Sequence, residues 1–403
     1  EGSINLAEGP IMRVVLIVTR GQKMQRSTIV WTIHHLVVDG VSWRVLAEDM
    51  LQLLQQNARK EASRLPLKTT SFVRWSERVY EYAESKELMA EMAYWTATLQ
   101  KGRGMRSLML DEKDRKEGKM KSVRITLAAA ESTFLMTTVC ALYRAQMNDV
   151  LLAAFVAAMI EVRGAMWGTA EEEKRKRRVL MTMEGHGREE IFADVDLSRT
   201  VGWFTSVFPV CLEVEDTVDV RKNVCAVLKA VKEQLRGIPQ RGVGYGILRY
   251  LNDDTARVLK ANEREERLFS EVSFNYLGQF KKGDQLQGGS GDEIDTSELE
   301  TTTESSMKWR KCIDVNVMVV DGRLQFSVDF NGRIATSELS EMFAPMFKSK
   351  LQRLVEECSV NGTGELGGCT PSDFPLVPDM TISQLDAMVA ATEGRASNVE
   401  DIY

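Results

Sequence analysis

The sequence predicts an α/β fold in two or three lobes, on the evidence of two residue patterns and the length of the chain. Strands are expected at short apolar runs, which lie at 11–18, 27–33, 123–127, 179–183, 208–214 and 271–278. Helices are expected where apolar residues recur at helical spacing, at 43–60, 70–99, 130–144, 148–162, 219–236 and 337–357. The 403 residues are enough for two or three compact lobes.

Some of these elements carry a more specific expectation. The runs at 11–18 and 27–33 are continuously apolar, which predicts two strands of a largely buried sheet. Ser42 is expected to cap the helix that follows them. Asn148 and Asp149 are expected to begin the helix at 148–162.

Connections between elements are also predicted. The charged stretch 111–121 is expected to be a solvated connector and a lobe boundary. The Gly/Ser/Asp-rich stretch 281–300 is expected to be a mobile insertion. Asp321 and Gly322 predict the turn of a strand–turn–strand hairpin within 309–331.

Composition restricts the class of protein. The chain is 44% hydrophobic and 27% charged, with a net charge of −6, which is typical of a globular protein and gives no reason to expect nucleic acid or an anionic membrane as a partner. We expect no membrane span or targeting leader, because no run of about 18 apolar residues is evident. The six cysteines form no CxxC pair, which favours reduced cytosolic thiols and no zinc site.

All three histidines lie in two glycine-flanked motifs. His34 and His35 open HHLVVDG, directly after the second predicted strand, and His186 lies in EGHGRE at the end of the strand at 179–183. Histidine is the side chain best suited to moving protons near neutral pH. This distribution indicates acid–base chemistry.

HHLVVDG has three interpretations. A metal site of His34, His35 and Asp39 is disfavoured, because adjacent residues on a strand point to opposite faces. A pair of structural histidines in a core is the second interpretation. The preferred one is a single catalytic imidazole, with Asp39 as an architectural partner and Gly40 permitting a tight turn.

A set of motifs points to a known family. HHLVVDGVSWRVL (34–46) resembles the signature of the condensation superfamily of nonribosomal peptide synthetases, in the form carried by epimerization domains. The chain also contains motifs that resemble the epimerization series in order: MNDVLLAAF (147–155), EGHGRE (184–189), RTVGWFTSVFP (199–209), PQRGVGYG (239–246) and FNYLGQF (274–280).

The resemblance implies a domain organisation. It implies two chloramphenicol acetyltransferase-like lobes in a V, an incomplete N-terminal lobe at 1–120 and a C-terminal lobe at 121–366. A linker at 367–397 and the start of a following condensation domain at 398–403 are implied as well. The family's opening segment is absent, so an exposed sheet edge and apolar surface are expected in the first lobe.

The resemblance also implies a reaction: L-to-D inversion at the α-carbon of an aminoacyl or peptidyl thioester. The substrate would be tethered to the 4′-phosphopantetheine arm of an upstream peptidyl carrier domain, with a downstream condensation domain in the same cytoplasmic polypeptide. A thioester acidifies the neighbouring Cα–H, so no bound cofactor or metal is required.

Site roles follow from the same resemblance. His35 would be the catalytic imidazole and Glu184 the carboxylate on the facing wall, while His34 would be architectural. Asp39 is expected to form a buried ion pair that holds its loop.

Other motif residues are given supporting roles. Arg188 is the candidate partner of Asp39, and His186 would orient either Glu184 or the substrate. Asn275 and Tyr276 could donate hydrogen bonds to the thioester or enolate. The aromatic residues Trp203, Phe204 and Tyr245 are expected to be channel wall and core. Gly242, Gly244 and Gly246 suit unusual dihedrals or close approach of the pantetheine arm.

Two alternative functions stay open. A condensation domain would join two carrier-bound substrates into a peptide, although EGHGRE and FNYLGQF argue against it. A non-catalytic carrier-docking fragment is the other alternative, because the opening segment of the family is missing.

Overall fold

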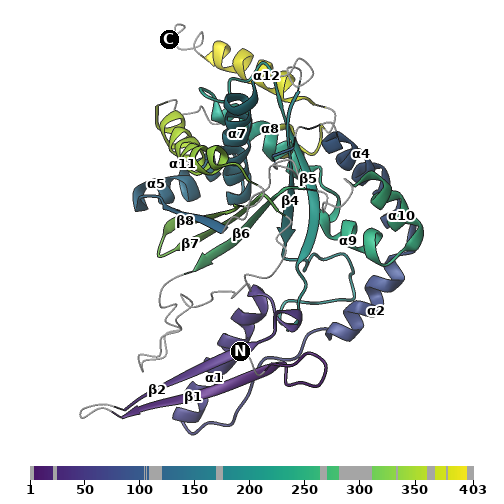
Figure 1. Cartoon of the computed structure of the whole chain (residues 1–403), viewed down its shortest axis with the longest axis vertical. Coiled ribbons are helices and arrows are strands. Elements are labelled where there is room, and N and C mark those ends of the chain that lie inside the picture. The colour runs from purple at the N-terminus through teal and green to yellow at the C-terminus, as the bar shows by residue number, and fades with distance from the viewer. Residues whose placement is uncertain are drawn as a thin grey trace. The chain divides into compact units, whose positions relative to one another are not determined.

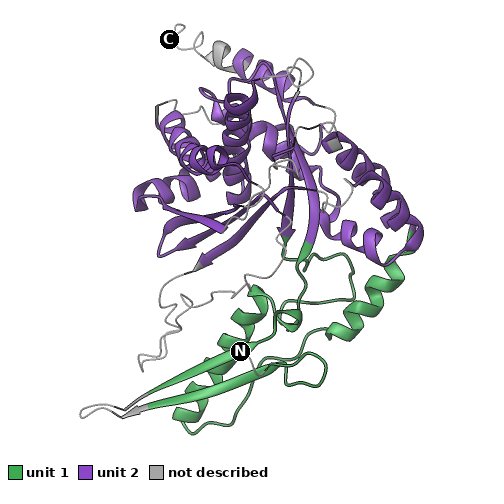
Figure 2. Cartoon of the chain, in the orientation of Figure 1, with its two compact units in different colours: residues 1–85, 185–206, 285–293 green, residues 86–184, 207–284, 294–403 purple. Residues whose placement is uncertain are grey.

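The computed structural model describes residues 4–20, 25–103, 105, 107–108, 120–168, 176–263, 270–280, 311–332, 335–360, 368–377 and 380–396. They divide into two compact units, shown in Figure 2. Unit 1 holds the described residues up to Ser85 together with 185–206, and unit 2 holds the others. The predictions for 111–119, 281–300 and 398–403 lie outside the described residues.

Unit 1 begins with a hairpin of two antiparallel strands, β1 (Met12–Arg20) and β2 (Gln25–Ile33). The expectation of a largely buried sheet is wrong. The described part of this sheet has two strands, and its apolar side chains are exposed, with Val15 at 53% and Leu16 at 61%. Trp43 packs on Trp31 near one end of the hairpin, at 5.8 Å between ring centroids. Most other apolar side chains of the two strands are exposed, so no comparable packing covers them in the described structure.

The rest of unit 1 is helical and is completed by a distant segment. A 3-10 turn (His35–Val37) leads into α1 (Gly40–Ala58), and α2 (Phe72–Tyr82) follows. Trp75 of α2 is buried against Phe192, Leu197 and Phe204 of the segment 185–206. This segment is therefore part of the unit 1 core, although unit 2 strands flank it in the sequence.

Unit 2 is built on a six-stranded sheet in the order β3-β8-β7-β6-β4-β5. The strands are β3 (Met120–Thr126), β4 (Lys176–Gly185), β5 (Ser206–Glu215), β6 (Val272–Phe280), β7 (Ile313–Val320) and β8 (Arg323–Asn331). β4, β6 and β7 run parallel, whereas β8 is antiparallel to β7 and β3. The predicted hairpin is confirmed, and Asp321 and Gly322 both have the positive φ that its turn requires (51° and 72°).

Helices cover one face of this sheet. α7 (Met147–Trp167) packs beside α8 (Val224–Arg236) and α11 (Ser337–Val360), as Figure 1 shows. Phe155 of α7 contacts Phe274 of β6 and Phe347 of α11. The helix predicted at 148–162 is present as α7, which begins one residue before Asn148, and Asp149 accepts from the N–H of Gln146. The helix predicted at 70–99 is instead divided among three helices, 72–82, 86–89 and 92–103.

α7 also corrects an expectation. By length and composition it is apolar enough to cross a membrane, although no such run was expected. Within unit 2, 72% of its most apolar 18-residue window is buried. Packing on three sides accounts for this apolarity.

The boundary between the compact units differs from the one expected at residue 120. α3 (Lys86–Met89) and α4 (Met92–Arg103) belong to unit 2, where they pack against α9 (Val243–Tyr250) and α10 (Asp253–Asn262). The physical reason is Trp95, which is fully buried against Phe208 and Tyr245. Between β3 and α7 lie α5 (Ala129–Phe134), a π-helix (Leu135–Val139) and α6 (Cys140–Leu142).

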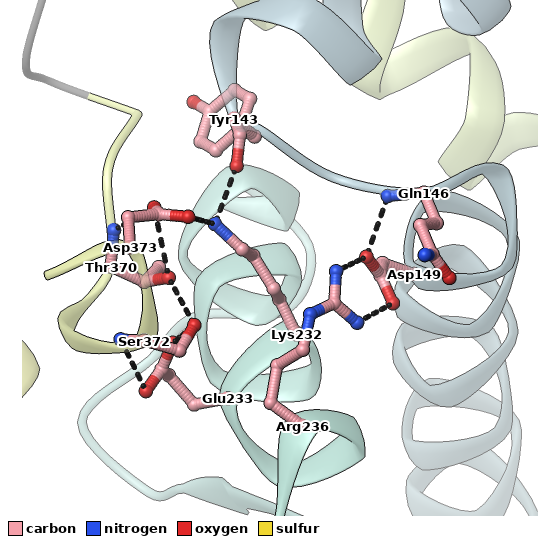
Figure 3. Close-up of polar contacts among 9 residues, drawn as sticks. All are labelled: Tyr143, Gln146, Asp149, Lys232, Glu233, Arg236, Thr370, Ser372 and Asp373. Atoms are coloured by element: carbon pink, nitrogen blue, oxygen red, sulfur yellow. Dashed lines mark hydrogen bonds and ion pairs between the residues drawn. The ribbon is translucent and has the colours of Figure 1, made fainter. Parts of the chain in front are cut away.

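The described part of the expected linker is folded against unit 2. It contains a 3-10 turn (Pro371–Asp373) and α12 (Ile382–Ala396). Figure 3 shows Lys232 of α8 donating to the carboxylate of Asp373 (2.6 and 2.8 Å) and to the carbonyl of Tyr143 (2.8 Å). Its neighbour Glu233 accepts from the backbone and side chain of Ser372.

Candidate active site

The two histidines of HHLVVDG have different surroundings. Nδ1 of His34 accepts from the backbone N–H of Leu36 (3.1 Å), which caps the 3-10 turn. His35 is exposed, and its ring lies 5.0 Å from the indole of Trp203. The interpretation of a buried structural pair does not fit, because neither imidazole is buried.

Asp39 is the residue that begins α1. Its Oδ1 accepts from the N–H of Ser42 (2.7 Å), so Asp39 is the N-cap and the expectation for Ser42 is wrong. Oδ2 accepts from the N–H of Phe204 (3.2 Å). Gly40 has no positive φ and open space where a Cβ would lie, so the backbone at this position does not require glycine.

The expected ion pair between Asp39 and Arg188 is confirmed. Nη2 of Arg188 lies 3.0 Å from both carboxylate oxygens, and both side chains are at most 7% exposed. Nη1 donates to the carbonyls of Leu197 (2.7 Å) and Thr200 (2.8 Å). The guanidinium also lies over the ring of Phe204, at 4.2 Å.

Ser42 joins the same cluster in a way that the sequence did not reveal. Its Oγ donates to the carbonyl of Gly202 (2.9 Å) and accepts from the N–H of Gly202 and from Nη2 of Arg188 (3.0 Å each). The start of α1 is thereby bonded to the 185–206 segment from several directions. The signal that the sequence offered for this role was the position of Ser42 inside the motif HHLVVDGVSWRVL.

Position 187, in the motif EGHGRE, requires glycine. Gly187 has φ +67°, and a Cβ there would lie 1.6 Å from the carbonyl oxygen of Phe204. His186 beside it accepts from the N–H of Arg188 (3.0 Å) and has Nε2 3.1 Å from Glu189. Its ring is therefore oriented within its own motif.

Glu184 is held by the neighbouring strand of unit 2. Thr182 and Met183 of β4 pair with Ser273 and Phe274 of β6. One residue further along, Nδ2 of Asn275 donates to Oε2 of Glu184 (3.0 Å). The parallel register thus brings Glu184 and Asn275, 91 residues apart, into contact.

Tyr276 is separated from this pair by the pleat. Successive residues of a strand point to opposite faces, so Tyr276 shares the helix-covered face with Phe274. Burial raises the pKa of Tyr276, and Cys140 adds to the effect. Asn275 and Tyr276 therefore point to opposite faces of β6, and the role expected for Tyr276 stays a prediction.

The aromatic residues divide into one surface residue and two core residues. Trp203 is 41% exposed, whereas Phe204 is 7% and Tyr245 is 0% exposed. The hydroxyl of Tyr245 donates to Glu263 (2.8 Å), and burial raises its pKa. Trp203 alone of the three is both exposed and beside His35.

The glycines of PQRGVGYG serve packing inside unit 2. A Cβ on Gly244 would lie 2.1 Å from Oε2 of Glu91, which accepts from Nε1 of Trp95 (2.9 Å). Gly242 has φ +92° and lies against Phe208. Gly246 has open space where a Cβ would lie. The close approaches found at this motif are to Glu91 and Phe208.

A metal site was the disfavoured interpretation of HHLVVDG. Among the residues that the structure describes, no group of three His, Cys, Asp or Glu side chains is arranged to hold a metal ion. The carboxylate of Asp39 is occupied by Arg188.

Comparison with known proteins gives a consistent family. Residues 1–364 match the family model described as "Condensation domain". The chain is 38% identical over 412 residues to a linear gramicidin synthase of Brevibacillus parabrevis and 35% identical over 399 residues to a surfactin synthase of Bacillus subtilis. These matches cover 100% and 96% of this chain but only 5% and 10% of the two synthetases.

Solved structures give the fold. The epimerization domain from the third module of tyrocidine synthetase B matches with a TM-score of 0.72 and 31% identity, over 90% of this chain and 75% of that one. The first condensation domain of the calcium-dependent antibiotic synthetase matches with a TM-score of 0.55 and 13% identity, over 86% of this chain and 67% of that one.

Proposed function

The chain belongs to the condensation-domain family of nonribosomal peptide synthetases, and from this premise we propose that it epimerizes the α-carbon of an aminoacyl or peptidyl thioester from L to D. The thioester would be held on the 4′-phosphopantetheine arm of a carrier protein. The 31% identity to a solved epimerization domain supports this choice, because the condensation domain compared above shares 13%.

Inversion requires a proton to leave one face of the α-carbon and another to arrive on the opposite face. We assign these transfers to His35 and Glu184. One group takes the Cα–H and leaves a thioester-stabilised enolate, and the other returns a proton to Cα from the far side. The thioester supplies the acidity, so the proposal needs no bound cofactor.

One observation carries the proposal most directly: the amide of Asn275 holds the carboxylate of Glu184. A hydrogen bond at 3.0 Å to one carboxylate oxygen fixes the orientation of the group, as proton transfer at a defined atom requires. Asn275 would thus be a positioning residue for Glu184. In unit 1, His34 would shape the turn that carries His35, and Trp203 would pack beside its ring.

The site's surroundings fit the same proposal. Asp39, Arg188 and Ser42 would hold the histidine loop and the EGHGRE segment together. We propose an upstream peptidyl carrier domain and a downstream condensation domain as partners in a cytoplasmic synthetase.

The test is α-proton exchange in deuterated water with a carrier-bound L-aminoacyl or peptidyl thioester, followed by chiral analysis of the released product. His35→Ala and Glu184→Gln should each lower the rate by about 10²–10⁴-fold. Glu190→Gln, at the exposed position directly after the same motif, is the matched control and should retain activity. Unchanged inversion in either site variant would remove the role given to that residue.

Peptide-bond formation is the second candidate, favoured by the description of the matching family model. Offering donor and acceptor carriers together distinguishes the two reactions. A condensation domain yields a dipeptide on the acceptor, whereas an epimerase yields deuterium at Cα. A docking fragment would give neither product.

A further inference from the structure

One face of the unit 2 sheet is polar across five adjacent strands, and the proposed chemistry uses only its corner. The register pairs Thr182 of β4 with Ser273 of β6, and continues through Asp314 of β7 and Asp329 of β8 to Ser122 of β3. All five side chains are polar. They form a row that crosses the strands.

A second polar row lies beside the first. From β6 to β3 the register aligns Asn275, Asn316, Ser327 and Arg124, and Glu184 of β4 begins the row through its bond to Asn275. Residues two apart on a strand share a face, so both rows lie on the same side of the sheet.

The residues between the rows confirm which side this is. Phe274, Val315 and Val328 are at most 1% exposed, and Phe274 packs on Phe155 of α7. The helices therefore cover the apolar face. The polar rows occupy the opposite face.

Hydrogen bonds link neighbouring members of the rows. The carboxylate of Asp314 accepts from the hydroxyl of Ser273 and from Nδ2 of Asn316 (3.1 Å). The hydroxyl of Ser327 lies 3.3 Å from Asp329 and 3.5 Å from the hydroxyl of Ser122. These bonds fix the side chains in place while asparagine and serine retain further donor and acceptor capacity.

The hydroxyl of Thr182 gives a second, independent argument for a bound group at this face. Its side chain is 2% exposed, and within the described part of the chain its Oγ1 has no hydrogen-bond partner. Leaving a buried hydroxyl without a partner is unfavourable. A bound group that supplies a donor or acceptor would remove this defect.

We propose that the two rows bind the main chain of a peptidyl substrate, an inference that rests on the proposed epimerization at Glu184. From β4 to β8 there are three strand spacings of about 4.8 Å, or about 14 Å in all, which matches about four residues of extended chain. A peptide main chain repeats one donor and one acceptor, and amide, hydroxyl and carboxylate side chains can pair with both.

This assignment selects the substrate class. A single aminoacyl group at Glu184 is too short to reach β7 and β8. A peptidyl thioester with three or more residues upstream would reach both. Recognition through the main chain leaves the identity of the upstream side chains free.

The test compares two carriers that bear the same reacting residue, one aminoacyl and one tetrapeptidyl. For the wild-type chain, kcat/KM for α-deuterium exchange should be higher with the tetrapeptide. Asn316→Leu and Ser327→Ala should each lower the tetrapeptidyl-to-aminoacyl ratio by about tenfold. Asn262→Leu, at the end of α10, makes the same chemical change away from the sheet and should leave the ratio unchanged.

Binding of amide-linked, non-reacting analogues of both carriers separates the two hypotheses. Absence of exchange with both substrates, together with tighter binding of the tetrapeptidyl analogue that depends on Asn316, would refute the epimerase and retain the peptide site. An equal response of both substrates or both analogues to Asn316→Leu would overturn the peptide site. In that case the rows contact a part common to both carriers, such as the pantetheine arm.

Discussion

Arg188 in unit 1 and Lys232 in unit 2 are both cations withdrawn from solvent, with side chains 7% and 1% exposed. Each is paired with a carboxylate from a distant part of the chain, Asp39 or Asp373. Arg188 bonds Asp39, Ser42 and two backbone carbonyls and also stacks on an aromatic ring. Lys232 uses its ammonium on Asp373 and one carbonyl.

The difference shows how side-chain geometry suits the task. A guanidinium presents five donors in a rigid fork, so Arg188 can join a helix start, a loop and a carbonyl pair at once. An ammonium is a compact charge with three donors, and Lys232 docks a single segment on α8 (Figure 3). Arg188 therefore joins several parts of unit 1, and Lys232 attaches the 3-10 turn that contains Asp373.

The largest expected effect on stability comes from removing the carboxylate of Asp39. Asp39→Ala leaves the buried Arg188 charge without its counter-ion and removes the cap of α1. We expect a loss of about 3–5 kcal/mol in the free energy of unfolding, measured by urea titration. Asp254→Ala, which breaks the exposed pair with Arg257, is the control and should change it far less.

Arg188→Lys tests whether the shape of the guanidinium, and not only its charge, is needed at this position. The charge is kept, but the bonds to the carbonyls of Leu197 and Thr200 cannot all be made by one ammonium. We expect a loss of about 2–3 kcal/mol in the free energy of unfolding. A lysine variant as stable as the wild type would show that charge alone suffices.

Lys232→Met should have a smaller global effect, of about 1–2 kcal/mol, because Asp373 can regain water when its segment detaches. The local effect should be clear. Amide hydrogen exchange in residues 368–377, which contain Asp373, should accelerate, while exchange in α7 stays slow. Lys229→Met, which removes the pair with Asp386 of α12, is the matched control. Equal exchange in both variants would argue against a special role for Lys232.

The smallest effect concerns Glu91, a buried carboxylate whose described hydrogen-bond donor is the neutral indole of Trp95. Burial raises its pKa, so the folded state keeps the proton to higher pH than the unfolded state does. This contribution to stability is full below the unfolded pKa and is lost as pH rises through the folded one. The free energy of unfolding of Glu91→Gln should therefore increase relative to that of the wild type as the pH rises from about 4 to about 7. This change should be smaller than the losses expected for Asp39→Ala and Lys232→Met.

Urea midpoints of both proteins at the two pH values measure this difference, since other titrating groups cancel between them. A constant difference across the range would contradict the assignment.

The sequence predicted where the strands and helices lie better than it predicted what packs against them. Apolar periodicity located the strands and helices, and the polar residues of two motifs correctly suggested the pair of Asp39 and Arg188. Burial of β1 and β2 was wrong, because an apolar run does not reveal what covers it. Ser42 was misplaced, because the side chain of Asp39 begins α1 three residues earlier.

The features that the sequence did not reveal have a common physical cause. Asn275 and Tyr276 are adjacent in the motif, but the pleat of β6 sends them to opposite faces. The packing of the C-terminal segment depends on Lys232 and Asp373, which are 141 residues apart. The polar rows require the register of five strands, and local patterns carry no information on register between distant strands.

The insertion of residues 185–206 into unit 1 has a consequence for cutting the polypeptide. The backbone leaves unit 2 after Glu184 and re-enters it at Val207, and it also crosses between the units after Ser85. A protease nick between Ser85 and Lys86 would break one crossing and leave fragment 1–85 bonded to 185–206 through Asp39, Ser42 and the Trp75 cluster. The nicked protein should therefore remain whole on a sizing column, and this joint is a natural place for a split reporter.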